Sequence, residues 1–193
     1  MPPKAKFSKA QITDAAFRIL RENGPEGLTA RALGAQLGSS ACPIFTAFEN
    51  MEEVQQAAIA AAKALYKEYI EKGLSETLAF KGVGTQYILF AVNEPKLFRL
   101  LFMSEQGTIP DFGSVLPLID QSYAEILESI VKNYPISETA AKRLYQHLWI
   151  YTHGIATLCA TKMCRFTEKE ISDLMTEVFT GLLKKIKESA NDD

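Results

Sequence analysis

Residues 28–48 read LTARALGAQLGSSACPIFTAF and place a short polar break, GSS, between two runs that both have helical patterning. Each run is barely two helical turns long, and Pro43 follows the serine pair Ser39 and Ser40. With either serine as N-cap, Pro43 falls in the first turn of the second run, where its missing amide hydrogen costs the helix little. The stretch therefore predicts two short helices joined by a three-residue turn.

A first helix is predicted before this stretch. Ser8 followed by Gln11 forms a capping box that starts a helix over about residues 8–23, and the segment ENGPEG ends it. Thr29 is placed to cap the next helix, which Gly38 closes.

A long fourth helix is predicted directly after the stretch. Asn50 followed by Glu53 reads as the cap and capping box of a helix over about 51–72. The order is then helix, short helix, tight turn, short helix, long helix. This order is typical of a helix-turn-helix, in which one helix crosses the DNA backbone and the next enters the major groove.

The remaining chain has helical periodicity throughout, with no strand signal and no internal repeat. We expect an all-α protein: a three-helix helix-turn-helix DNA-binding domain over 1–50 and a helical ligand-binding and dimerisation bundle over 51–193. Residues 104–114 form the one long loop, and a capping box of Thr167 and Glu170 opens the last helix. The further helices are expected near 75–93, 95–104, 114–134, 137–163 and 167–189.

The composition narrows the class of protein. The 193 residues are 47% hydrophobic and contain no apolar run of about 18 residues. The start of the chain lacks an apolar signal-peptide core, so we expect a cytoplasmic protein without membrane association. The three cysteines have no metal-ligand or disulfide-scaffold spacing, which fits a reducing compartment and predicts neither a metal site nor a cofactor.

The charge is unevenly distributed. Residues 1–50 carry six basic groups against four acidic ones, a net charge of +2, which leaves −4 for the rest of a chain whose net charge is −2. A basic end is a candidate for contact with a polyanion, although a mildly uneven solvated surface has the same signature and nucleic-acid footprints are usually more basic.

The sequence resembles the TetR family of transcriptional repressors. The resemblance covers residues 8–54: a first helix ending in glycine, then LTARALGAQLG, a serine-led turn, PIFTAF, and ENMEEV. A second, separate match is WIYTHG at 149–154, which is similar to the Trp-x-x-x-His-Gly signature of one subgroup of TetR ligand domains. The chain departs from the family where Phe45 replaces a common Tyr and Met51 a common Lys. Both changes remove a group that would contact phosphate.

The resemblance implies a DNA-contacting set around the turn. Phe45 and Phe48 are three residues apart on a short helix, so at least one must lie in the core; Phe48 is expected there, and the family position favours the DNA side for Phe45. Thr29 and Ser40 cap helices in any case, and helix N-termini attract phosphate. The expected DNA-binding residues are Thr29, Ala30, Arg31, Ser39, Ser40, Ala41, Pro43, Ile44, Phe45 and Asn50.

Aromatic residues and methionine gather in the middle of the chain. Aromatic-lined pockets with few polar groups hold apolar or amphipathic small molecules, although aromatics at helical spacing are more often plain core. No nucleophile, metal set or phosphate loop can be assembled around His153, so we expect no enzyme and no catalytic residue. The expected pocket residues are Tyr87, Phe90, Phe102, Met103, Phe112, Tyr123, Trp149 and His153.

The last two predicted helices indicate that two copies of the chain form a dimer. The run 137–163 is apolar nearly all round and must be buried on two sides, which suggests a second copy of the chain on one of them. The alternative is a fully internal helix in a monomer. The expected dimer-interface residues are Tyr151, Ile155, Leu158, Leu174, Val178, Phe179 and Leu182.

Two functions follow as hypotheses. The first is a homodimeric, ligand-responsive transcriptional repressor that binds a palindromic operator in double-stranded DNA. A small apolar or amphipathic effector would tilt the long fourth helix and change the spacing of the two recognition helices, which must be about 34–36 Å apart. The second is a helical small-molecule binder or oligomeric adaptor whose weakened motif no longer reads DNA.

Cys42 is predicted near the start of the recognition helix. A helix N-terminus stabilises a thiolate, so oxidation of Cys42 would switch DNA binding off. The alternative is that Cys42 fills a position where a small residue is sufficient.

Overall fold

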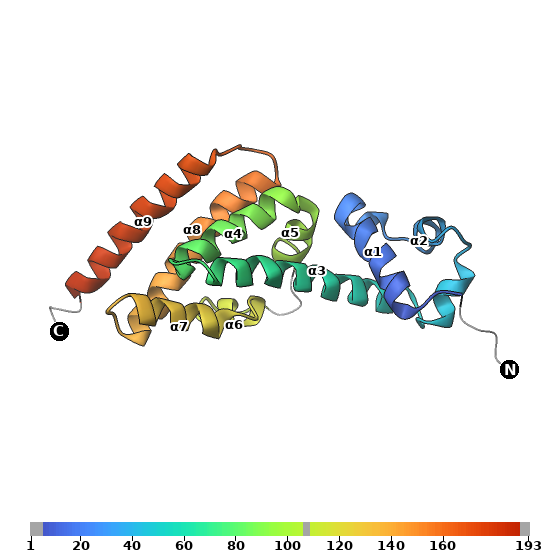
Figure 1. Ribbon diagram of the computed structural model, residues 1–193, viewed down its shortest axis with the longest axis horizontal. Coiled ribbons are helices and arrows are strands. Elements are labelled where there is room, and N and C mark those ends of the chain that lie inside the picture. Colours follow the sequence, from blue (N-terminus) through green and yellow to red (C-terminus); the bar gives the residue numbers. More distant parts are fainter. Residues whose placement is uncertain (1–5, 106–108, 190–193) are drawn as a thin grey trace. The chain divides into compact units, whose positions relative to one another are not determined.

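The computed structural model describes residues 6–105 and 109–189, and these residues form helices and connecting segments without any strand. The all-α fold expected from the sequence is confirmed. Figure 1 shows the helices in chain order: α1 (Lys9–Asn23), η1 (Pro25–Gly27), α2 (Ala30–Gln36), η2 (Cys42–Thr46), α3 (Met51–Leu74), α4 (Ala79–Asn93), α5 (Pro95–Phe102), α6 (Val115–Ile119), α7 (Tyr123–Asn133), α8 (Glu138–Ala160) and α9 (Glu168–Ser189).

The described residues divide into two compact units. The first comprises residues up to 66 together with 96–104, and the second comprises 67–95 together with the residues from 105 onward. The first unit thus extends beyond the expected region 1–50, because it takes in the first part of α3 and most of α5. Phe102 accounts for this, since its ring lies 4.9 Å from Tyr66 and 5.3 Å from Phe98.

The N-terminal helices begin where the sequence predicts. Ser8 and Gln11 form the complete capping box of α1, and Gly24 ends the helix with φ +81°. The side chain of Thr29 accepts a hydrogen bond from the Ala32 amide, which caps α2. Each cap satisfies an amide that the helix itself leaves without a partner.

Two local predictions in this region are wrong in detail. The third helix is a single 3₁₀ segment, η2, whose N-cap is Ala41 rather than Ser39 or Ser40. Asn50 does cap α3 by accepting from the Glu53 amide at 2.9 Å, but the Glu53 carboxylate accepts from the Glu49 amide at 2.8 Å, one residue before the cap. Pro43 does lie in the first turn of η2.

The second unit is built around close contact between the end of α3 and the start of α4. A Cβ atom on Gly82 would lie 2.3 Å from the Gly73 carbonyl oxygen, and one on Gly73 would lie 2.6 Å from the Val83 amide nitrogen. Atoms cannot approach so closely, so glycine is required on both helices. α4 then packs against α7, α8 and α9.

The predicted helix 114–134 is interrupted. It forms α6 and α7, because the Asp120 carboxylate accepts from the Ser122 amide at 2.9 Å and the backbone leaves the helical path at Asp120. The capping box of α9 is confirmed by reciprocal hydrogen bonds between Thr167 and Glu170. Among the described helices, none has the length and apolar character needed to cross a membrane.

Candidate functional site

The turn after α2 is held tightly against that helix. Leu33 is fully buried, and a Cβ on the neighbouring Gly34 would lie 2.9 Å from the Ser40 carbonyl carbon and 3.0 Å from the Ala41 nitrogen. Only glycine allows the turn to come this close. Gly38 has φ +63°, which favours glycine as well, so two glycines shape the turn. Of these two, the sequence pattern indicates Gly38 and gives no signal for Gly34.

The η2 segment has one buried side and one exposed side. Ile44 is completely buried and Phe48, just beyond the segment, is 2% exposed, whereas Phe45 is 45% exposed. Phe48 therefore belongs to the core, and Phe45 faces outward. The prediction that the Ile44 side chain contacts DNA is wrong, because a side chain with no exposed surface packs in the core and cannot touch a partner.

The other expected DNA residues lie at or near the surface. Ala30, Ser39, Ala41 and Pro43 are half-buried. The exposed members of the set are Thr29, Arg31, Ser40, Phe45 and Asn50.

A lysine outside the expected DNA-binding set lies at the same turn. The Lys6 ammonium donates to the Ser39 hydroxyl at 2.9 Å and lies 5.3 Å from the centre of the Phe7 ring. Both Lys6 and Ser39 keep exposed surface. The signal for Lys6 was its position just before the Ser8 cap, in a basic segment, but only the fold brings it to the serine pair.

Lys9 has a different role. Its ammonium pairs with the Glu53 carboxylate at 2.5 Å and lies 4.7 Å from the centre of the Phe48 ring. The hydrogen bond from Lys9 is the largest cause that holds the pKa of Glu53 below its ordinary value, followed by the bond from the Glu49 amide. Lys9 thus joins the start of α1 to the start of α3 within the first unit.

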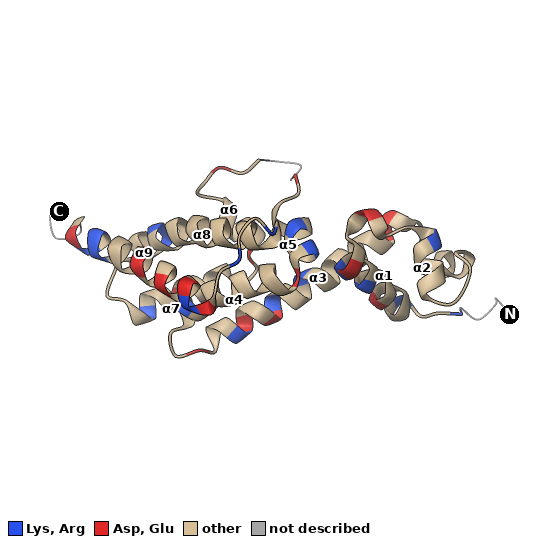
Figure 2. Cartoon of the chain, turned by 90° about the horizontal axis from the view of Figure 1, so that it is seen from above, with Lys and Arg blue, Asp and Glu red and all other residues tan. Residues whose placement is uncertain are grey.

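Figure 2 shows basic and acidic residues interspersed along α1, so the helix has no purely basic face. At the turn itself the Lys6 ammonium contacts Ser39, and Arg31 is exposed on α2. Cys42 is exposed at the first position of η2. The segment that begins at Cys42 is five residues of 3₁₀ helix, not the regular helix that the sequence predicts.

The second unit contains a buried polar cluster, defined here as Tyr87, Asp120, Tyr145 and His153. The Tyr87 hydroxyl and the His153 Nδ1 are 2.9 Å apart, and the Tyr145 hydroxyl donates to Asp120 Oδ2 at 3.2 Å. Tyr87, Asp120 and Tyr145 are less than 10% exposed. Such groups are retained inside a protein only where hydrogen bonds satisfy them.

The electrostatics of the cluster favour uncharged tyrosine and histidine. Burial raises the pKa of Tyr87 and of Tyr145, and in both cases the negative charge of Asp120 raises it further. Burial lowers the pKa of His153, so the imidazole is neutral at pH 7. The cluster therefore consists of neutral hydroxyl and imidazole groups together with one carboxylate, that of Asp120.

Aromatic rings surround this cluster. Trp149 stacks on His153 with ring centres 5.2 Å apart, and Tyr123 stacks on Tyr145 at 5.7 Å. The fold therefore brings four of the expected pocket residues, Tyr87, Tyr123, Trp149 and His153, to this part of the second unit.

The other four expected pocket residues lie elsewhere. Phe90 is fully buried and packs edge-to-face on Tyr69, with ring centres 5.3 Å apart. Phe112 is 50% exposed in the segment that precedes α6. Phe102 and Met103 belong to the first unit, so the eight residues do not form one group. The alternative interpretation as plain core fits Phe90 and Phe102.

The expected dimer residues lie on α8 and α9. Tyr151, Leu158, Leu174, Val178 and Leu182 are half-buried in the single chain. Two of the expected residues make their contacts within the chain. Ile155 is 5% exposed. The Phe179 ring centre lies 5.0 Å from that of Tyr134 and 6.3 Å from that of Phe80. Ile150, outside the expected set, is 51% exposed on α8.

No family model and no curated protein matches this chain. Among solved structures it is similar to the fatty acid degradation regulator FadR from Bacillus halodurans, with a TM-score of 0.57 and 19% sequence identity over 91% of this chain and 94% of that one. At this identity the likeness shows a shared fold. It extends over nearly the full length of both proteins.

Proposed function

We propose that this chain is a DNA-binding transcriptional regulator: a homodimeric, ligand-responsive repressor of a palindromic operator, related to the TetR family. The observation that carries the proposal is the turn of the first unit. There Gly34 and the Thr29 cap hold a two-serine turn against α2, and the outward faces of the turn and of η2 carry Ser40 and Phe45. The full-length likeness to FadR, by its name a regulator, supports the same interpretation.

In this proposal the turn residues position the protein on the phosphate backbone. Hydroxyl groups, backbone amides and lysines are the usual phosphate partners, and they fix register without reading sequence. Lys6, hydrogen-bonded to Ser39, supplies a cation near a motif that has neither a hydroxyl at Phe45 nor a charge at Met51. We therefore expect few cationic side chains to contact the DNA phosphates. With so few contacts in each copy, high affinity requires a dimer that binds with both copies.

Dimerisation is proposed through the half-buried side of α8 and α9. Leu174, Val178 and Leu182 repeat at intervals of four residues on α9, and Ile150 adds exposed apolar surface on α8. A two-fold arrangement uses the same patch on both copies, which a palindromic site would mirror. The effector is proposed to be a small apolar or amphipathic molecule that favours one spacing of the two motifs.

DNA binding is tested with fragments of the promoter region upstream of the gene, by fluorescence anisotropy between about 50 and 200 mM salt. We expect affinity to fall as salt rises, because phosphate contacts release counterions, with a shallow slope that matches the few cations of the footprint. Lys6→Gln should lower the slope by about 1, while Lys187→Gln on α9 should leave it unchanged.

Dimerisation is tested by sedimentation analysis. Leu182→Glu should yield monomers and abolish operator binding, whereas Val131→Glu, at a 42% exposed position on α7, should leave the dimer intact. A monomeric parent protein that still binds the operator with full affinity would contradict the dimer.

A second candidate function is a helical small-molecule binder or adaptor without DNA binding. It is favoured by the shortness of η2, five residues of 3₁₀ helix, and by the missing hydroxyl and charge at Phe45 and Met51. Retention of a stable dimer together with no salt-dependent binding to any upstream fragment would select this candidate.

A further inference from the structure

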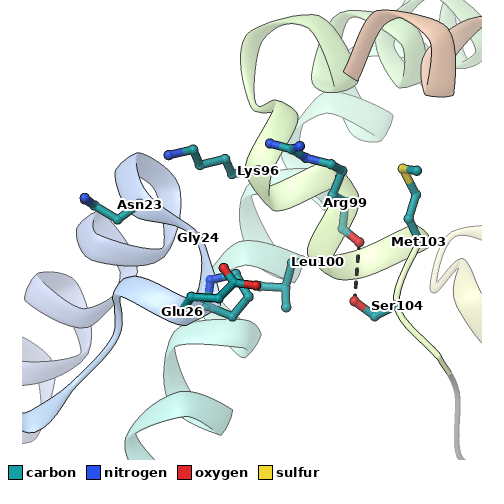
Figure 3. A pocket seen from close by; sticks show the side chains of 9 residues that line it. Asn23, Gly24, Glu26, Lys96, Arg99, Leu100, Met103 and Ser104 are labelled. Atoms are coloured by element: carbon teal, nitrogen blue, oxygen red, sulfur yellow. Dashed lines mark hydrogen bonds between the residues drawn. The ribbon is translucent and has the colours of Figure 1, made fainter. Parts of the chain in front are cut away.

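A cavity of about 370 Å³ lies within the first unit, between the turn that ends α1 and one side of α5 (Figure 3). Pockets for small ligands measure about 300–1,000 Å³, so this volume suits a small organic molecule. The residues that give the cavity its chemistry are Gly24, Glu26, Lys96, Arg99, Leu100 and Met103.

The α1 side of the cavity is fixed by backbone geometry. Gly24 has φ +81°, and a Cβ there would lie 3.1 Å from the Glu26 carboxylate and 3.9 Å from the Lys96 side chain. The Lys96 ammonium donates a hydrogen bond to the Glu22 carbonyl at the end of α1. This hydrogen bond joins the α1 wall of the cavity to the α5 wall, and it forms without any bound ligand.

The charged side chains in the lining of the cavity are two cations and one carboxylate. Lys96 and Arg99 extend from α5 along one rim, and Glu26 lies across from them on η1 (Figure 3). A guanidinium group suits bidentate contact with carboxylate or phosphate, and an ammonium group has three donors, of which the Glu22 carbonyl uses one.

The rest of the lining is mixed: Pro25, Leu100 and Met103 are apolar, whereas Asn23 and Ser104 are polar. Leu100 is half-buried next to Glu26, and Met103, at the other end, is 42% exposed. A flexible thioether adapts its shape to varied apolar groups. The cationic side chains of Lys96 and Arg99 and the apolar side chains of Leu100 and Met103 therefore line the same small cavity.

We propose that this cavity binds a small organic anion, with its carboxylate or phosphate group held by Lys96 and Arg99 and its apolar group against Leu100 and Met103. The site is separate from the buried polar cluster of the second unit. It does not depend on the proposed DNA binding.

The test is isothermal titration calorimetry on the full chain with hexanoate and hexyl phosphate, and with hexanol and hexylamine as neutral and cationic counterparts. We expect at least one anion to bind and the two counterparts not to bind. Arg99→Gln should weaken anion binding about tenfold, the loss of one charge-assisted hydrogen bond. Lys63→Gln, an exposed cation on α3 outside the cavity lining, is the matched control and should bind like the parent protein.

Met103→Glu is the second variant, chosen because the exposed position tolerates a polar residue and the new carboxylate repels an anion. It should also weaken binding, with an unchanged circular dichroism spectrum. The anion that binds more tightly shows whether the site prefers a carboxylate or a phosphate group. The proposal is overturned if neither anion binds at millimolar concentration, if hexanol or hexylamine binds equally well, if Met103→Glu binds like the parent, or if Lys63→Gln loses as much affinity as Arg99→Gln.

Discussion

The turn of the first unit and the buried polar cluster of the second are stabilised in different ways. The turn is built from neighbours in sequence: Thr29 caps the helix that ends at Gln36, and Gly34 lies within six residues of Ser40. In the cluster, Tyr87 and His153 are 66 residues apart, and Asp120 and Tyr145 are 25 apart. Local chemistry is enough for the first, whereas the second exists only after several helices have packed.

This difference predicts how each region responds to change. A cap or a turn glycine acts on one segment, so its loss should affect the first unit and any DNA contact before it affects the rest. A residue at the helix crossing of the second unit supports every helix that packs around it. The expected effects therefore decrease from the crossing, to the turn, to the cluster, to a single cap.

The largest effect is expected for Gly82→Ala. The new Cβ would lie 2.3 Å from the Gly73 carbonyl oxygen, so α3 and α4 must separate. Unfolding free energy should fall by about 3 kcal/mol, the upper part of the range for overpacking, measured by urea denaturation. Gly154→Ala on α8 is the control, because no atom lies within 4 Å of its added Cβ; it should gain roughly 0.5–1 kcal/mol from helix propensity. Equal stability of the two variants would show that the crossing is not tight.

Gly34→Ala should have the next largest effect. Its Cβ would lie inside the van der Waals limit of the Ser40 and Ala41 backbone, and we expect a loss of about 2 kcal/mol. Displacing the turn should also abolish operator binding in the proposed regulator. Ala35→Gly, one residue further along on the exposed side of α2, should cost about 1 kcal/mol through propensity and retain binding.

His153 should make stability sensitive to mild acid. Its pKa is below the ordinary value of 6.5 because of burial, so at pH below about 6.5 the unfolded chain binds a proton that the folded chain resists. Stability should therefore fall as the pH drops from 7 towards the lowered pKa of the folded protein. In His153→Phe, which keeps a ring for Trp149 to stack on, this part of the pH dependence should be absent. A parent protein with flat stability over the same interval would contradict the assignment.

The smallest effect is expected for Thr29→Ala. The variant loses the hydrogen bond between the Thr29 hydroxyl and the Ala32 amide, which should cost about 1 kcal/mol. Thr29→Ser keeps the hydroxyl and should retain most of the stability, so thermal unfolding of the pair isolates the cap. A loss of similar size in both variants would mean that the Thr29 methyl group, not its hydroxyl, is responsible.

Much of the fold was predictable because its signals are short-range. The caps Ser8, Thr29 and Thr167 are each indicated by residues within a few positions of the helix start, and each forms in the structure. The structure differs from the prediction where the backbone departs from a regular α-helix. The serines of the turn were expected to cap a regular helix, but that segment is a 3₁₀ turn capped at Ala41. The Asp120 side chain, which bonds the Ser122 amide, similarly divides a helix that looked continuous.

The candidate sites were less predictable. Helical periodicity identifies apolar residues but not which of them pack together. The sequence therefore predicts one pocket for Phe102, Met103 and Tyr87, although Phe102 and Met103 lie in the other unit. In the same way, Lys6 is one basic residue among several in the sequence, and only folding places it on Ser39.

The sequence by itself determined the helical class, most helix starts and the two-serine turn, because capping and periodicity act over three to seven residues. Tertiary structure alone decided that Ile44 is buried and Phe45 exposed, that Asp120 meets Tyr145, and that the end of α1 meets Lys96 to form a cavity. These outcomes depend on close packing between segments far apart in the chain, where tenths of an ångström at Gly34 or Gly82 decide what fits.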